Sequence, residues 1–148
     1  MARFISLMAL LPLMTAILLV SGCSTFHREW RKASVNQFST ADLQGRWEGT
    51  WHSDKTGHSG KLRCIITKTD DGVFHAHFHA KFFKIMSFSY TVPLKAEQSA
   101  NQFDFSGEAD LGRKAGGVYH YEGQADAVNF FSKYSSSKDH GTFQMTRP

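Results

Sequence analysis

The sequence contains little proline and cysteine, and it has no cluster of positive charge. Only 3 prolines and 2 cysteines occur among its 148 residues, and no run of four or more lysines and arginines accompanies the net charge of +4. A nucleic-acid-binding surface concentrates such charges on one face or along one element. The chain therefore lacks the usual footprint of a nucleic-acid partner.

Motifs of common enzymes are also missing. The chain has no Gly-x-Ser-x-Gly nucleophile elbow, and its basic, glycine-rich segment Gly112–Gly117 is not followed by the helix that a phosphate-binding loop requires. Cys64 shares the apolar side of a candidate strand with Leu62 and Ile66, which is typical of a buried, unreactive thiol. We therefore expect a protein that is not an enzyme and needs no cofactor.

Aromatic residues and glycines are abundant instead. Aromatics make up 14% of the chain, with 13 phenylalanines, and 12 glycines are present. This composition favours β-structure over a helix bundle. The length fits one domain, because a domain typically has about 100–200 residues.

The N-terminus has the pattern of a targeting signal. Arg3 precedes residues 4–20, which are uncharged and mostly aliphatic, and the stretch ends in Val20-Ser21-Gly22-Cys23. Here the chain resembles bacterial lipoprotein precursors, whose lipobox has an aliphatic residue, two small residues and an invariant cysteine. The resemblance implies a signal peptide over residues 1–22, cleavage before Cys23, and acyl chains on the Cys23 sulfur and its new amine.

These acyl chains would attach the mature protein to a membrane, because two or three chains bind firmly where one binds only marginally. Cys23 is followed by Ser24, not by the Asp that tends to retain lipoproteins of Gram-negative bacteria at the inner membrane. The resemblance thus implies a cell-envelope location, at the outer membrane and facing the periplasm if the host is Gram-negative. An uncleaved membrane anchor and a plain secretory signal are the alternatives.

Residues 23–44 are expected to form the lipidated N-terminus, a tether and a short helical turn. The tether could lie on the headgroup surface, with Trp30 at the interface and neighbouring basic side chains toward anionic lipid. A solvated spacer is the alternative. The helical turn would cover Ser39–Leu43, with Ser39 as its N-cap.

From residue 45 onward, turn signals separate short segments in which apolar and polar residues alternate. A polar loop is expected over residues 95–101. The short connections favour an all-β, antiparallel, up-and-down barrel over residues 45–148, because closure removes exposed strand edges. The eight expected strands cover residues 45–52, 61–69, 73–83, 86–94, 103–111, 119–125, 130–135 and 142–147.

The start of this domain resembles the lipocalin-like (calycin) barrels. Those barrels open with a short helical turn and then Gly-x-Trp on the first strand, and the matching residues here are Ser39–Leu43 and Gly45-Arg46-Trp47. They often pack a basic residue of the last strand over that tryptophan, and Arg147 has the matching position. The resemblance implies an eight-stranded barrel that is filled by side chains or holds one small ligand. More broadly, the chain resembles other small bacterial lipoproteins, which implies no activity.

The alternation predicts an inner barrel face that is rich in aromatic residues, with alanine and glycine between them. The space that such small residues leave suits a small apolar or lipid-like ligand. A closed aromatic core, with the barrel acting as a structural or interaction module of the envelope, is the alternative. The candidate ligand-binding residues are Trp47, Phe74, Phe78, Phe82, Phe88, Tyr90, Phe103, Phe105 and Tyr119.

Three histidines alternate along one expected strand. His75, His77 and His79 share a face, about 7 Å apart, and two of them with a third ligand from a neighbouring strand could bind zinc or copper. The opposite face of this strand is apolar, so the histidines are expected to face outward. The alternative is that they keep an exposed strand soluble and gain charge near pH 6.5.

A six-residue pattern, aromatic-x-Gly-x-Ala-Asp, occurs at Phe105–Asp110 and again at Tyr121–Asp126. A glycine within a strand marks a bend, a bulge or a close approach of another chain segment. An aromatic ring two residues earlier can cover the gap that the glycine leaves. We interpret both segments as barrel bends whose acidic side chains point to water, and the alternative is an acidic site.

Overall fold

The computed structural model describes residues 21–35 and 42–148. These residues form the helix α2 (Ser21–Val35), eight strands and one short 3-10 turn, η1 (Arg113–Ala115). The strands are β1 (Gly45–Ser53), β2 (Ser59–Lys68), β3 (Phe74–Phe82), β4 (Met86–Ser99), β5 (Gln102–Asp110), β6 (Val118–Ala125), β7 (Asn129–Ser135) and β8 (His140–Thr146).

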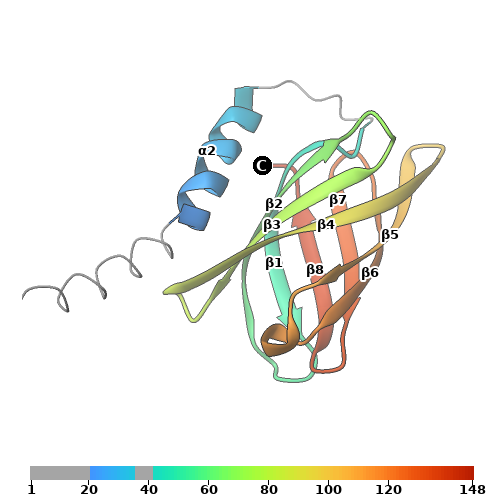
Figure 1. The fold of residues 1–148 in the computed structure, drawn as a ribbon. Coiled ribbons are helices and arrows are strands. Elements are labelled where there is room, and N and C mark those ends of the chain that lie inside the picture. Colours follow the sequence, from blue (N-terminus) through green and yellow to red (C-terminus); the bar gives the residue numbers. More distant parts are fainter. Residues whose placement is uncertain (1–20, 36–41) are drawn as a thin grey trace, which may run out of the picture.

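The eight strands pair in sequence order, and β8 pairs with β1, so the sheet closes into a barrel (Figure 1). Every pairing is antiparallel. The all-β, up-and-down barrel expected from the alternation is therefore confirmed. Alternation along β3 shows why the sheet closes with one face inside. Its inward residues Phe74, Ala76 and Phe78 are at most 4% exposed, whereas the outward Lys81 is exposed.

The main difference in strand bounds concerns β4, which continues to Ser99 through the segment where we expected a polar loop. This half of β4 pairs with β5, from Leu94 opposite Gly107 to Ser99 opposite Gln102. Ala96 continues the inward positions and packs against the core. The outward side chains face water and are polar. The segment therefore has the composition of a loop, although its backbone is paired in the sheet.

Aromatic rings fill the barrel interior. Phe78 is 1% exposed, and its ring centroid lies 5.5 Å from that of Tyr90, 6.2 Å from that of Tyr121 and 5.3 Å from that of Phe143. Such offset and tilted ring pairs contribute about 0.5–1.5 kcal/mol each beyond their buried area. The centre of the barrel is therefore a packed core.

The repeated pattern places each aromatic ring opposite the glycine of the neighbouring strand. In the β5–β6 register, Phe105 faces Gly123 and Tyr121 faces Gly107. A Cβ atom on Gly123 would lie 2.8 Å from Phe105 Cζ, so the ring occupies the space that the glycine leaves. At Gly123 a ring of the neighbouring strand thus covers part of the gap, while the backbone of Phe131 and Ser132 in β7 approaches it still more closely; at Gly107 the nearest atoms belong to Pro93, Leu94 and Val92 of β4. The acidic residues of the pattern, Glu108, Asp110, Glu122 and Asp126, are exposed.

Trp47 and Arg147 close one end of the barrel. The guanidinium carbon of Arg147 lies 3.9 Å from the Trp47 ring centroid. Arg147 donates hydrogen bonds to the carbonyl oxygens of Asp42 and Gln44, and the Trp47 indole nitrogen donates one to the Leu43 carbonyl at 3.0 Å. Arg147 therefore has the position that the lipocalin-like resemblance implies.

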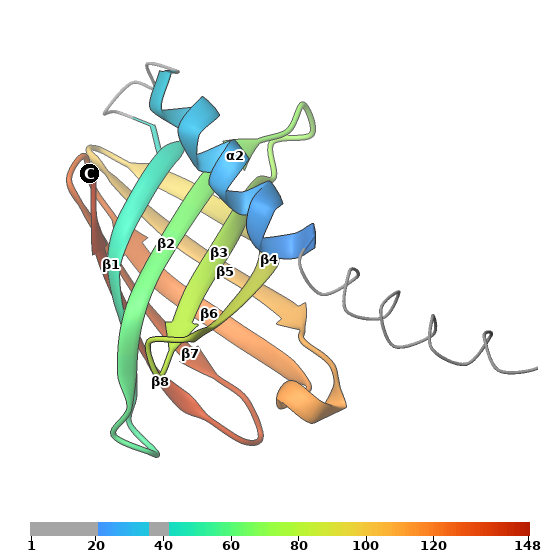
Figure 2. The same cartoon turned by 90° about the vertical axis from the view of Figure 1, so that its left-hand side faces the viewer.

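Helix α2 lies on the outside of the barrel, across its first strands (Figure 2). Phe26, Trp30 and Ala33 recur on one helix face and pack with Ile65 of β2 in a second hydrophobic cluster. Phe26 is fully buried, and Trp30 is 8% exposed. The structure thus has a docked helix where the sequence suggested a tether, and Trp30 contacts protein. The docked helix also explains why Ile65 interrupts the alternation of β2.

Two further expectations concern residues near the N-terminus. The helical turn over Ser39–Leu43 falls mostly outside the described residues, of which Asp42 and Leu43 form a bend. Residues 1–20, most of the expected signal peptide, also lie outside them. Within the part of the chain that the structure describes, no helix has both the length and the apolar character required to cross a membrane.

Candidate functional site

A cleft of about 740 Å³ opens at the end of the barrel where β1 meets β2 and β3 meets β4. We call it the mouth cleft. Its apolar part consists of Trp51, Phe82 and Phe83. Its polar part consists of Ser53, Thr56, His58, Ser59, Lys61, Lys81, Lys84 and Asp139, and Gly60 completes the lining.

The apolar part is built by two strands that the barrel brings together. The ring centroids of Trp51 and Phe82 lie 4.7 Å apart. The Trp51 indole nitrogen donates a hydrogen bond to the Lys81 carbonyl at 3.0 Å, which fixes the ring. Gly60 pairs with Trp51, and a Cβ atom there would lie 2.6 Å from the indole nitrogen, so glycine permits this packing.

A network of hydrogen bonds forms one polar side of the mouth cleft. Ser53 Oγ donates to Asp139 Oδ1 at 2.6 Å, and Tyr134 Oη donates to Asp139 Oδ2 at 3.1 Å. Burial, followed by the charge of Asp139, raises the pKa of Tyr134, so its hydroxyl remains a neutral donor. The network ties β1 and β7 to the β7–β8 turn and therefore makes this side of the mouth rigid.

Three exposed lysines, Lys61, Lys81 and Lys84, also line the mouth cleft. Lys61 and Lys81 occupy outward positions of β2 and β3, and Lys84 lies in the β3–β4 turn, so the positive charge lies at the outer rim of the cleft. Exposed ammonium groups beside an apolar surface can hold an anionic headgroup while the rings contact an aliphatic chain. The arrangement suits binding of an amphiphile.

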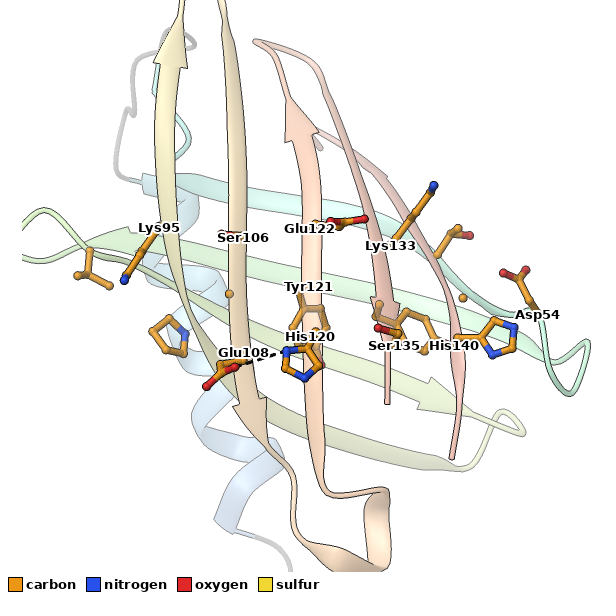
Figure 3. A pocket seen from close by; sticks show the side chains of 16 residues that line it. Asp54, Lys95, Ser106, Glu108, His120, Tyr121, Glu122, Lys133, Ser135 and His140 are labelled. Atoms are coloured by element: carbon orange, nitrogen blue, oxygen red, sulfur yellow. Dashed lines mark ion pairs between the residues drawn. The ribbon is translucent and has the colours of Figure 1, made fainter. Parts of the chain in front are cut away.

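A larger hollow of about 890 Å³ crosses the outer face of the barrel from β4 to β8 (Figure 3). Its side chains alternate in charge, among them Lys95, Glu108, His120 and Lys133. Glu108 Oε2 lies 3.4 Å from His120 Nδ1, and the two side chains are 69% and 63% exposed. Because both groups are solvated, their interaction is weak. The hollow is open to solvent on the outer wall, and its exposed charged side chains attract one another only weakly.

The structure places the predicted wall residues mainly in the packed core. Trp47, Phe74, Phe78, Phe103 and Phe105 are buried, and Phe82, Tyr90 and Tyr119 are partly buried. Phe88 is 40% exposed. Of this set only Phe82 lines the mouth cleft.

Sequence reasoning missed Trp51 and the three cleft lysines as site residues. Trp51 could have been found, because it shares an inward face with Trp47, a candidate wall residue, and lies nearer the strand end. Lys61, Lys81 and Lys84 have no distinguishing local pattern. They come together only because β2 pairs with β3 in the observed register.

The three histidines face outward, as expected, but α2 covers part of the row. His77 Nδ1 lies 2.8 Å from Glu29 Oε2 of α2. His79 is 3% exposed, its Nδ1 is hydrogen-bonded to Ser89 Oγ at 2.7 Å, and the Phe26 ring stacks on it at 4.7 Å. His75 remains partly exposed. Two of the imidazoles thus hold the helix and its flanking strands together.

Burial determines the ionisation of two groups near this region. Burial, and then the positive potential of neighbouring basic groups, lowers the pKa of His79, so the neutral imidazole is favoured. Cys64 is a free, fully buried thiol, and burial raises its pKa. Its thiolate is therefore disfavoured, in agreement with the expected unreactive role.

Among residues 21–35 and 42–148, no group of three or more histidine, cysteine or acidic side chains has a geometry that could hold a metal ion. Comparison with known proteins adds no identification, because no family model, curated protein or solved structure matches the chain. The residues of the mouth cleft therefore carry the functional argument.

Proposed function

We propose that this protein is a lipid-anchored lipoprotein of the bacterial cell envelope whose barrel binds an amphiphile at the mouth cleft. The ligand would have an aliphatic chain and an anionic head, as a fatty acid or a lysophospholipid has. The single observation that carries this proposal is the Trp51–Phe82 pair with three lysines beside it. No chemical transformation is part of the proposal.

The packing of the barrel supports a site at the mouth over a site at the centre. Phe78 and its neighbouring rings fill the centre, so a ligand cannot enter there without displacing them. At the mouth, space of about 740 Å³ is within the 300–1,000 Å³ range typical of small-molecule sites. A ligand held there keeps its head in water.

The anchor is supported by the lipobox and by the position of Cys23. Cys23 lies in the first turn of α2, and Phe26, fully buried against the barrel, follows three residues later. Acyl chains on Cys23 would therefore hold the barrel directly at a membrane. The outer membrane, facing the periplasm, is the proposed site if the host is Gram-negative.

A second candidate function is that of a structural or interaction module of the envelope. The filled aromatic centre favours it, because a barrel without a ligand space can still present its outer wall to a partner. The two candidates differ in whether a lipid accompanies the protein. Native mass spectrometry of the full chain, extracted from its host envelope, distinguishes them.

For the ligand, we expect a non-covalent adduct of amphiphile mass in addition to the mass of the acylated chain. The charge reversals Lys81→Glu and Lys84→Glu should each lower the adduct fraction several-fold. Lys133→Glu, a charge reversal on the outer wall, is the matched control and should leave it unchanged. An adduct-free wild-type chain would favour the interaction module.

For the anchor, mass spectrometry of the N-terminal peptide of the mature chain is decisive. We expect it to begin at Cys23 and to carry a diacylglyceryl thioether with an acylated amine. Cys23→Ser should abolish this mass and leave the chain unprocessed. A free Cys23 thiol in the wild-type protein would disprove the anchor without bearing on the mouth cleft.

A further inference from the structure

The β3–β4 hairpin ends in apolar side chains that water surrounds. We call Phe83, Lys84, Ile85 and Met86 the hairpin tip. Ile85 is 89% exposed, Phe83 is 68% exposed and Met86 is 58% exposed. Exposed apolar residues that occur singly are ordinary, but three within four positions at a projecting turn are not.

The backbone of the hairpin tip is unusual for its residues. Phe83 and Lys84 adopt positive φ values of 48° and 67°, in the region that glycine and asparagine normally occupy. A glycine or asparagine would make the same turn with less strain. Placing Phe83 and Lys84 at these positions therefore costs conformational free energy. Backbone strain of this kind is common at functional sites.

The hairpin tip projects from the same side of the molecule as the beginning of α2. Figure 1 shows both at the left of the barrel, and Figure 2, which looks onto that side, shows both toward the viewer. The buried Phe26 follows Cys23 by three positions, a distance of only about 10 Å even when the chain is extended. A membrane that holds Cys23 is therefore close to this side of the barrel.

We propose that the hairpin tip inserts into the bilayer to which Cys23 is anchored and forms a second membrane contact. Phe83 and Ile85 would enter the boundary between headgroups and acyl chains, while Lys81 and Lys84, both exposed, would contact anionic headgroups. Together with the acyl chains, this contact would fix the orientation of the barrel. This inference rests on the proposed anchor.

Insertion would also place the mouth cleft at the lipid surface. Phe83 and Lys84 belong both to the hairpin tip and to the lining of the cleft. His58 of the cleft contacts the Phe83 ring, with centroids 5.3 Å apart. An amphiphile could then pass between bilayer and cleft without crossing water.

The test uses the full-length chain with Ile85→Cys, labelled with a nitroxide and reconstituted into phosphatidylcholine vesicles with and without phosphatidylglycerol. Cys64 is fully buried, so it does not compete for the label. Val128→Cys is the matched control, because Val128 is an exposed apolar residue, 56% exposed, in the β6–β7 turn. Electron paramagnetic resonance then compares label collisions with oxygen, which concentrates in lipid, and with a nickel chelate, which remains in water.

We expect the oxygen-to-nickel collision ratio at position 85 to be several-fold higher than at position 128, and to increase with phosphatidylglycerol. In the double variant Ile85→Cys/Lys84→Glu the dependence on phosphatidylglycerol should decrease. Equal ratios at the two positions would overturn the proposal. Dipolar broadening between labels at position 85 would also overturn it, because the tip would then contact a second copy of the chain.

Mass spectrometry of the same samples separates this inference from the anchor. An acylated Cys23 together with a water-exposed label at position 85 contradicts insertion alone. A Cys23 without acyl chains contradicts the anchor, and because its free thiol would also take the label, the insertion is then read from Ile85→Cys in a Cys23→Ser background, where a lipid-exposed label would still support it.

Discussion

The protein has two hydrophobic clusters that differ in how they are held. The inner cluster consists of inward residues from all eight strands, with Phe78 at its centre. The outer cluster consists of Phe26, Trp30, Ile65 and Ala33, between α2 and the outer wall of β2. The closed sheet surrounds the inner cluster, whereas the outer cluster is covered only by one face of α2. The inner cluster should therefore determine global stability, and the outer one only the docking of α2.

The polar surroundings of the two clusters differ as well. Two arginines contact the Trp30 ring, with guanidinium carbons 5.0 Å (Arg46) and 4.9 Å (Arg63) from its centroid. His77 is paired with Glu29 beside it. The outer cluster thus depends on charged and titratable groups, so its packing should respond to pH and salt.

The largest effect is expected inside the barrel. Phe78→Ala removes the ring that contacts Tyr90, Tyr121 and Phe143, and should lower the free energy of unfolding by about 3–5 kcal/mol. Denaturant titration followed by circular dichroism measures it. Phe131→Ala is the matched control, because Phe131 is 39% exposed on the outer wall, and should cost less than about 1 kcal/mol. Similar losses for both variants would contradict a barrel-centred core.

Phe26→Ala should release the helix and leave the barrel folded. Phe26 is fully buried between α2 and the histidines of β3, so docking should weaken by about 3 kcal/mol while unfolding of the barrel changes by less than about 1 kcal/mol. Hydrogen exchange of the α2 amides should accelerate, and that of β3 should not. The control is Arg28→Ala, on the exposed face of the same helix. A cooperative loss of both elements would show that the two clusters form one unit.

Acidification should weaken the outer cluster selectively. The pKa of His79 is lowered in the folded protein, so the unfolded or undocked state binds a proton more readily. The contribution of neutral His79 is complete above its ordinary pKa of about 6.5 and decreases as the pH falls toward the lower folded value. The protection factors of the α2 amides, which compare their exchange with the intrinsic rate at the same pH, should therefore decrease below about pH 6.5. The charged or titratable groups facing this histidine and its neighbour are His27, Lys81, Arg63, His77 and Glu29.

The variant His79→Leu tests the assignment of this pH dependence. It keeps an apolar surface for the Phe26 ring and removes the titrating group, so α2 should remain protected at low pH. His120→Gln, on the exposed wall, should behave as the wild type does. If the pH dependence persisted in His79→Leu, another group would be responsible.

The smallest effect is expected on the uncovered wall of β5–β8. Glu108→Gln removes the exposed ion pair with His120, and unfolding should change by less than about 0.5 kcal/mol. Glu29→Gln, which removes the pair with half-buried His77 under α2, should accelerate exchange of the helix amides more clearly. Equal, negligible effects would show that ion pairs do not distinguish the two walls.

Much of the barrel could be predicted because its signal is local. Apolar and polar residues alternate along β3 from Phe74 to Lys81, and one face of each strand must be buried, so the sequence specifies which side chains point inward. Short connections favour pairing in sequence order. The second half of β4 escaped prediction, because its outward positions are as polar as a loop.

The site was harder to predict than the fold. Most aromatic residues chosen as ligand contacts pack against one another, since alternation reveals which side chains point inward but not how closely they pack. The helix was missed although Phe26, Trp30 and Ala33 have helical spacing, because a stripe of three residues is short and its partner, Ile65, lies elsewhere in the chain.

The sequence by itself determined the strands and the closed all-β topology, because these follow from alternation along each segment and from the order of the segments, whereas the position of Arg147 over Trp47 was implied only by the lipocalin-like resemblance. Only the tertiary structure decided that α2 covers two of the three histidines, that Trp51 and Phe82 meet three lysines at the mouth, and that the hairpin tip remains exposed. These features depend on the register between distant strands and on close packing, which local patterns of hydrophobicity do not contain.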